Sequence, residues 1–145
     1  MADQGTLQGL TVTMAKHPSS LKLESPLREA NEEAKEKEEA TVLYEGPIRP
    51  LCALAPNNVN SMAAGAIAAH TLGFDRVIGR LVADPNLRDW HIVSVSVTGL
   101  DGFSVSTERK NPARVGAVTG QLTYFSFLAS IKEGRFKPAG GLYIC

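Results

Sequence analysis

With 145 residues and 43% hydrophobic side chains, the chain has the length of one domain and enough apolar residues for a buried core, which excludes a disordered or fibrous protein. Lysine plus arginine number 15, as do aspartate plus glutamate, so there is no net charge to attract nucleic acid or an anionic membrane. Because no signal-like stretch opens the chain and no apolar run approaches the roughly 20 residues that span a bilayer, we expect a soluble cytoplasmic protein.

The two cysteines, Cys52 and Cys145, are too few and too far apart for a disulfide framework. We expect both to be reduced thiols, as in most cytosolic proteins. No pair of histidines or cysteines has the spacing of a zinc site, so a metal enzyme is disfavoured and we expect no metal site.

The first segment with a regular pattern is residues 7–15, where Leu10, Val12 and Met14 alternate with threonines, as in a half-buried strand. Residues 28–39 favour helix by propensity but show no apolar stripe. We therefore expect a charged, solvated helical insertion at about 28–40.

A second strand is expected over residues 41–45, closed by Gly46-Pro47. Residues 55–60 form a turn-and-cap sequence, and residues 61–72 follow as an alanine-rich helix that Gly73 stops. The side chains of this helix are so small that we expect another backbone to lie close to it.

Residues 77–83 are mostly apolar on both faces and indicate a central strand. Residues 90–97 and 103–107 are joined by a short glycine-containing connection and indicate a hairpin. The last periodic segment, residues 119–132, predicts an amphipathic helix that buries one stripe. The order of elements predicts a single α+β domain, residues 1–145, with helices packed on one face of a mixed or mostly antiparallel sheet.

His91 shares one face of its expected strand with three valines, whereas His17 and His70 occupy positions typical of exposed or cap-interacting imidazoles. Burial would lower the pKa of His91 and leave a neutral imidazole able to take a proton, as a general base must. A histidine packed in the core without a catalytic role would give the same pattern.

Three asparagines, Asn57, Asn58 and Asn60, precede the alanine-rich helix. Asparagine is a favoured helix cap, which accounts for one of them. Three within four residues is more than a cap requires, and amide side chains at a helix start can pair with a carboxamide or carboxylate ligand. The residues alone therefore leave two readings open, a cap or one wall of a pocket whose other wall is the strand carrying His91.

These segments together resemble the L-aspartate dehydrogenase family, in its C-terminal catalytic and dimerisation domain. The resemblance covers about residues 41–120, and the segment from Leu10 to His17 is similar to the strand that enters this domain in the family. It rests on Ala55-Pro-Asn-Asn-Val-Asn60, the alanine-rich helix, Leu72-Gly-Phe-Asp-Arg76, Leu81-Val-Ala-Asp-Pro85, Trp90-His-Ile92 and Asn111-Pro-Ala113. The chain departs from the family pattern at Asn57, where members have glutamine, and at Trp90, where they have asparagine.

The resemblance implies NAD(P)-dependent oxidative deamination of L-aspartate to iminoaspartate, which hydrolyses to oxaloacetate and ammonia or feeds NAD biosynthesis. It assigns the catalytic role to His91 and a contact with the nicotinamide cofactor to Asn60. It also implies a homodimer with L-aspartate as substrate, NAD or NADP as cofactor, and no nucleic acid or membrane partner.

Members of the family begin with a glycine-rich dinucleotide-binding domain of the Rossmann type. No Gly-x-Gly-x-x-Gly motif occurs in this sequence, so we expect the chain to lack that domain. The alternative function is therefore a truncated, catalytically inactive dimerisation domain.

Overall fold

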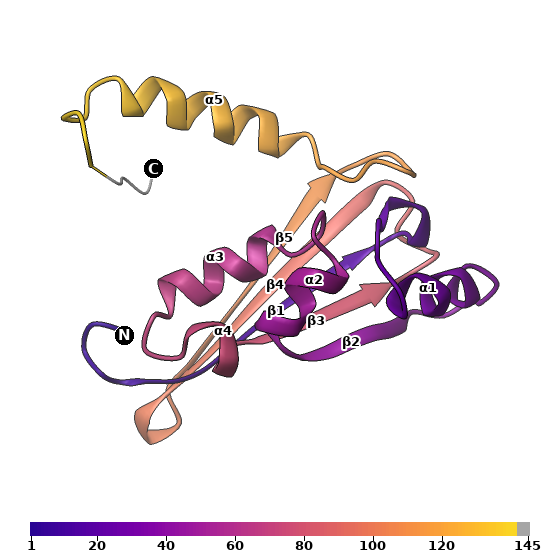
Figure 1. Cartoon of the computed structure of the whole chain (residues 1–145), viewed down its shortest axis with the longest axis horizontal. Helices are drawn as coiled ribbons and strands as arrows, with labels where there is room; N and C mark the ends of the chain where they lie inside the picture. The colour runs from indigo at the N-terminus through magenta and orange to yellow at the C-terminus, as the bar shows by residue number, and fades with distance from the viewer. Residues whose placement is uncertain (142–145) are drawn as a thin grey trace.

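A five-stranded mixed sheet runs through the middle of the computed structural model, which describes residues 1–141 (Figure 1). The strand order is β2-β3-β1-β4-β5, with β1 parallel to β3 and antiparallel to β4. The strands are β1 (Leu7–Lys16), β2 (Thr41–Pro47), β3 (Ile78–Ala83), β4 (Trp90–Gly99) and β5 (Ser104–Pro112). The helices are α1 (Leu27–Lys35), α2 (Ile48–Leu54), α3 (Asn60–Ala68), α4 (Gly73–Arg76) and α5 (Leu122–Gly134), with short 3-10 turns at Pro18–Ser20 and Leu100–Gly102. The predicted α+β class is confirmed.

The core lies between one face of the sheet and the layer formed by α2, α3 and α4 (Figure 1). The period-two pattern of β1 turns Leu10, Val12 and Met14 toward these helices, as predicted. The largest fully buried apolar side chains come from both layers and are Ile48, Leu51, Met62, Leu81, Val12 and Val77.

Helix α3 lies close to β1 at Gly65. A Cβ atom at this position would lie 2.9 Å from Val12 Cγ2 and 3.4 Å from Leu10 Cδ2. The first distance is shorter than carbon atoms tolerate in a packed interior, so a residue without a side chain is needed here. The glycine thus lets α3 pack closely on β1, although the atoms that meet it belong to side chains and not to the backbone that was expected there.

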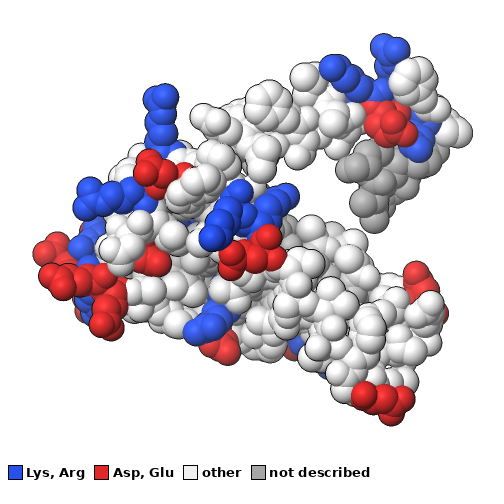
Figure 2. Space-filling view, turned by 180° about the vertical axis from the view of Figure 1, so that it is seen from behind, with Lys and Arg blue, Asp and Glu red and all other residues white. Residues whose placement is uncertain are grey.

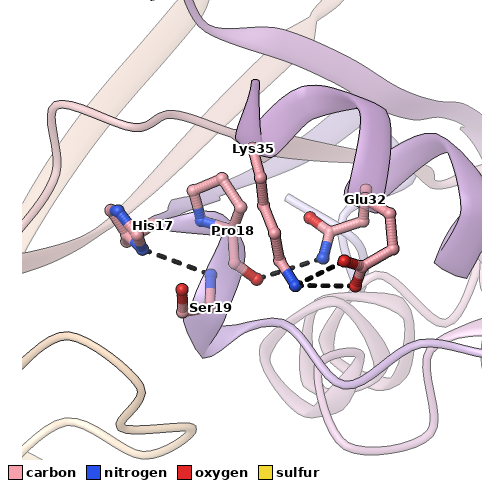
Figure 3. Close-up of polar contacts among 6 residues, drawn as sticks. His17, Pro18, Ser19, Glu32 and Lys35 are labelled. Carbon is pink, nitrogen blue, oxygen red and sulfur yellow. Dashed lines mark hydrogen bonds and ion pairs between the residues drawn. The ribbon is translucent and has the colours of Figure 1, made fainter. Parts of the chain in front are cut away.

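Helix α1 is shorter than predicted and is not fully solvated. The Asn31 amide nitrogen donates to the Pro18 carbonyl at 3.1 Å, while Lys35 pairs with the Glu32 carboxylate at 2.7 Å on the exposed side (Figure 3). The prediction missed the buried side of α1 because Asn31 lies between Leu27 and Ala34 and breaks the apolar stripe. Asn31 can be buried there because it bonds to a backbone carbonyl. The buried residues are Leu27, Asn31 and Ala34.

Helix α2 was not predicted, and the sequence indicated only the end of the preceding strand at Gly46-Pro47. Pro47 is the N-cap of α2 and Pro50 lies in its first turn, where the backbone N–H that proline lacks would have no partner in the helix. The alanine-rich helix predicted over residues 61–72 begins at Asn60 and ends at Ala68, and α4 follows as a separate short helix.

The predicted hairpin of β4 and β5 is confirmed, but β5 continues to Pro112 instead of ending at residue 107. The strand lies at the edge of the sheet and its residues from 104 to 110 are exposed. Because neither face of this part is buried, its second half has no alternation of apolar and polar residues from which a strand could be predicted. Its ladder with β4 extends to the pair Trp90 and Pro112 and carries Asn111 to the end of the sheet.

Helix α5 forms as predicted, but its apolar side chains are exposed instead of buried. Figure 1 shows it standing apart from the sheet, and Figure 2 shows few charged side chains along most of its length. The side chains of Tyr124, Phe125 and Phe127 are each 68% exposed. Within residues 1–141 no helix, α5 included, is long and apolar enough to cross a lipid bilayer.

Cys52 lies on α2 and is a half-buried free thiol. Cys145, the other cysteine of the sequence, lies outside the described residues.

Candidate functional site

A cavity of about 360 Å³ lies at the end of the sheet where β1 ends and β4 begins. Its walls come from these two strands, from β5, from the start of α3 and from the segment that leads into α5. His91 and Asn60, which are 31 positions apart in the sequence, both line it. Asn60 is the exposed first residue of α3, and His91 is the second residue of β4.

His91 is buried, with 4% of its surface exposed, on the helix-covered face of the sheet. Burial and, to a smaller extent, the nearby Lys16 charge lower the pKa of the imidazole to about 4, against a hydrogen bond to the Ala117 backbone that raises it. The hydrogen bond with Ala117 raises the pKa, which means that it stabilises the protonated ring, so the imidazole donates and the Ala117 backbone accepts. Nε2 has no partner within residues 1–141, so Nδ1 is the donor and Nε2 is a free acceptor at neutral pH.

Three polar residues form a row across neighbouring strands at this end of the sheet. His91 of β4 pairs directly with Asn111 of β5. On the other side of β4, Ala15 of the antiparallel strand β1 pairs with Ile92. The next pair in this register is Lys16 with His91, so these two residues lie opposite each other. Lys16, His91 and Asn111 are all buried and all line the cavity.

Lys16 was not identified as a site residue from the sequence. Its Nζ donates to Asn58 Oδ1 at 3.0 Å and to the Val118 carbonyl at 2.7 Å. Burial lowers its pKa to about 8, so the side chain is mainly a cation at neutral pH. The signal was present in the sequence, because Lys16 continues the period-two series of Leu10, Val12 and Met14 and is the one charged residue on that buried face.

The three asparagines have different positions. Asn58 is buried, and its side chain joins Lys16 to the Lys22 carbonyl, to which Nδ2 donates at 2.9 Å. The N-cap of α3 is Val59 and no side chain caps it, so the capping interpretation is wrong for this helix. Asn57 and Asn60 are exposed and line the cavity, where their amides are free to face a ligand.

The cavity is positively charged. Lys16 lies at its buried end and Arg109 of β5 lies at its exposed rim. No aspartate or glutamate is among the described residues that line it, and none of the ion pairs within residues 1–141 includes Lys16. A buried cation without a carboxylate partner favours an anionic ligand. The arrangement can therefore bind a small anion beside a neutral imidazole.

The other two histidines lie away from the cavity. His17 precedes the first 3-10 turn, and its Nδ1 accepts a hydrogen bond from the Ser19 backbone at 3.2 Å (Figure 3). His70 is exposed and lies 3.7 Å from Asp3. Both positions agree with the expectation of a cap-interacting or exposed imidazole.

Comparisons with known proteins agree on one family. The sequence model described as "Aspartate dehydrogenase, C-terminal" matches residues 1–133. The chain is 52% identical over 151 residues to an aspartate dehydrogenase domain-containing protein of Xenopus tropicalis, covering all of this chain and 52% of the frog protein. It is 50% identical to the Danio rerio protein of the same description, covering 51% of that protein. It is also 34% identical to an L-aspartate dehydrogenase of Cupriavidus taiwanensis, over 64% of this chain and 34% of the bacterial protein. The chain thus spans about half the length of the two vertebrate relatives.

Proposed function

Because this chain belongs to the family of aspartate dehydrogenase C-terminal domains, we propose that it carries the catalytic half of an NAD(P)-dependent L-aspartate dehydrogenase. The reaction converts L-aspartate and NAD(P)⁺ to iminoaspartate, NAD(P)H and a proton, and hydrolysis of the imine gives oxaloacetate and ammonia. We place this enzyme in the cytoplasm, linked to NAD biosynthesis through iminoaspartate.

The observation that carries this proposal is the unpartnered Nε2 of a buried, neutral His91 in a positively charged cavity. A neutral imidazole can accept the proton that the substrate amine loses as the carbon–nitrogen double bond forms. The protonated ring can then return this proton to solvent or exchange it with the water that attacks the imine. A dicarboxylate substrate would also offset the charge of Lys16 and so raise the pKa of His91 toward the value at which a general base works best.

The cofactor contact is assigned to Asn60. Bound nicotinamide would accept a hydride from the α-carbon of the substrate. The cavity of about 360 Å³ suits the nicotinamide end of a dinucleotide with a small amino acid but not a whole dinucleotide. The exposed amides of Asn57 and Asn60 supply donors and acceptors that match a carboxamide. Because the sequence has no glycine-rich phosphate-binding motif, we expect the chain alone to bind NAD(P) weakly.

The test is formation of reduced cofactor by the 145-residue chain with L-aspartate and millimolar NAD or NADP. We expect absorbance from the reduced nicotinamide, and we expect His91→Ala to lower the rate by about 100- to 10,000-fold. His70→Ala is the matched control, because its imidazole is exposed and does not line the cavity. Activity that survives His91→Ala would remove His91 from the catalytic role.

A second function, an inactive dimerisation domain, is favoured by one observation, the exposed apolar side chains of α5. A contiguous exposed apolar surface of this kind is typical of protein interfaces. Both functions predict a homodimer, but only the first predicts that the chain binds substrate and cofactor. Calorimetric titration separates them, because an inert dimerisation domain would bind neither L-aspartate nor NAD(P).

A further inference from the structure

The Lys16 ammonium has an unused donor and lines the cavity. An ammonium group has three N–H donors, and the Lys16 Nζ gives two of them to Asn58 and Val118. The third has no partner within residues 1–141, and Lys16 lines the cavity. Only 4% of this residue is exposed, so water compensates its charge poorly. A carboxylate of a ligand supplies both the missing acceptor and the missing negative charge.

On the other side of His91 the cavity requires hydrogen-bond donors. Asn111 Oδ1 and His91 Nε2 are both buried, and neither has a partner in the part of the chain that is described. Both are acceptors, and they belong to residues that pair directly across β4 and β5. A buried acceptor without a donor is costly, so a ligand that brings N–H groups is favoured at this point. A primary amine or ammonium group carries enough donors for both atoms.

The spacing of the row matches a small ligand. Lys16 and Asn111 lie on the strands either side of β4, so their backbones are about 10 Å apart, which is two strand spacings. The cavity lies over this interval, with His91 between the two residues. A carboxylate at one end and an amine nearer the other would place the α-carbon of an amino acid beside the imidazole.

We propose that Lys16 binds a carboxylate of the substrate and that Asn111 accepts a hydrogen bond from its amino group, so that these two residues recognise an amino acid by these two groups. This inference rests on the proposed function but concerns binding alone. It assigns a separate chemical group of the substrate to each residue. The two contacts can therefore be removed one at a time.

The experiment is calorimetric titration of the 145-residue chain at neutral pH with two probes, succinate and L-aspartate, which differ by the amino group. Lys16→Met should weaken both by about 10- to 100-fold, the usual cost of a lost hydrogen bond to a charged group. Asn111→Leu should weaken L-aspartate by a similar factor and leave succinate unchanged. Lys35→Met, which removes a lysine on the far helix α1, should change neither.

Three results would overturn the proposal: no succinate binding by the unmodified chain, equal binding by Lys16→Met, or an equal loss of both probes in Asn111→Leu. A purely structural role for Lys16 predicts that Lys16→Met lowers the melting temperature without a binding defect. Methionine fills a similar volume and needs no hydrogen-bond partner, but the change leaves the acceptors of Asn58 and Val118 without their donor, so a lower melting temperature is expected in either case and the binding defect decides. Neither probe needs NAD(P) for these measurements, so a failure of dehydrogenase activity leaves this result intact, and the reverse also holds.

Discussion

Lys16 and His91 share the buried face of neighbouring strands, and the Lys16 charge adds to burial in lowering the pKa of His91 to about 4. This relationship joins the end of β1 to the start of β4. It makes the imidazole a neutral acceptor at physiological pH. It also means that a negatively charged ligand that neutralises the Lys16 ammonium would raise the pKa of His91.

The first prediction concerns the pKa of His91 itself. We expect nuclear magnetic resonance titration of the His91 ring to give a value near 4, and we expect Lys16→Met to raise it, since the mutation removes a nearby positive charge. Lys35→Met, distant from the cavity, should leave the titration unchanged. An unchanged His91 titration in Lys16→Met would contradict the electrostatic contact between the two side chains.

The lowered pKa also predicts how stability depends on pH. The folded chain binds a proton on His91 near pH 4, whereas the unfolded chain binds it near the ordinary value of 6.5. Between these values the unfolded state holds more protons, so the free energy of unfolding should rise with pH from about 4 to 6.5. Urea denaturation across this window measures the slope. His91→Gln should show a shallower slope than the unmodified chain, and an identical slope would contradict the assignment.

A third prediction tests the packing that holds α3 over the cavity. Gly65→Ala should destabilise the fold by about 1–3 kcal/mol, because its Cβ would lie 2.9 Å from Val12 Cγ2. Gly134→Ala is the matched control, since Gly134 is also helical and no atom lies within 4 Å of its Cβ position. The control should be neutral or stabilising by up to about 1 kcal/mol. Equal effects of the two changes on thermal unfolding would show that α3 is not in close contact with β1.

A fourth prediction concerns the exposed apolar side chains of α5. We expect the chain to sediment as a dimer, and we expect Phe127→Glu to shift it toward monomer because a charge in an apolar interface is not compensated. Lys132→Glu introduces a glutamate at a polar position of the same helix and should leave the dimer intact. A monomer at high concentration of the unmodified chain would show that α5 does not mediate self-association.

The sequence predicted the sheet well, because the strands alternate polar and apolar residues and their turns contain glycine, proline or asparagine. It predicted α1 but missed its buried face, which a hydrogen-bonded asparagine interrupts, and it missed α2, which has a proline in its first turn. The apolar stripe of α5 was predicted to be buried but is exposed. Helical spacing of apolar residues shows that a helix has an apolar face, but it does not show whether the same chain covers that face.

The residues that line the cavity were predicted in part. His91 and Asn60 were identified by pattern and by family resemblance, and both line one cavity. Lys16 and Asn111 were missed as site residues because their position follows from strand register, which a single sequence does not specify. A lysine that continues the buried face of a strand was the one signal that could have identified the first of them.

The most direct test of the central claim is transfer of the substrate hydride. L-Aspartate deuterated at its α-carbon is incubated with the chain and oxidised NAD or NADP, and the reduced cofactor is examined by mass spectrometry. We predict that the unmodified chain yields cofactor carrying one deuterium and that His91→Ala yields almost none. Reduced cofactor without deuterium, or equal deuterium transfer by His91→Ala, would contradict the claim that this cavity catalyses the dehydrogenation of L-aspartate.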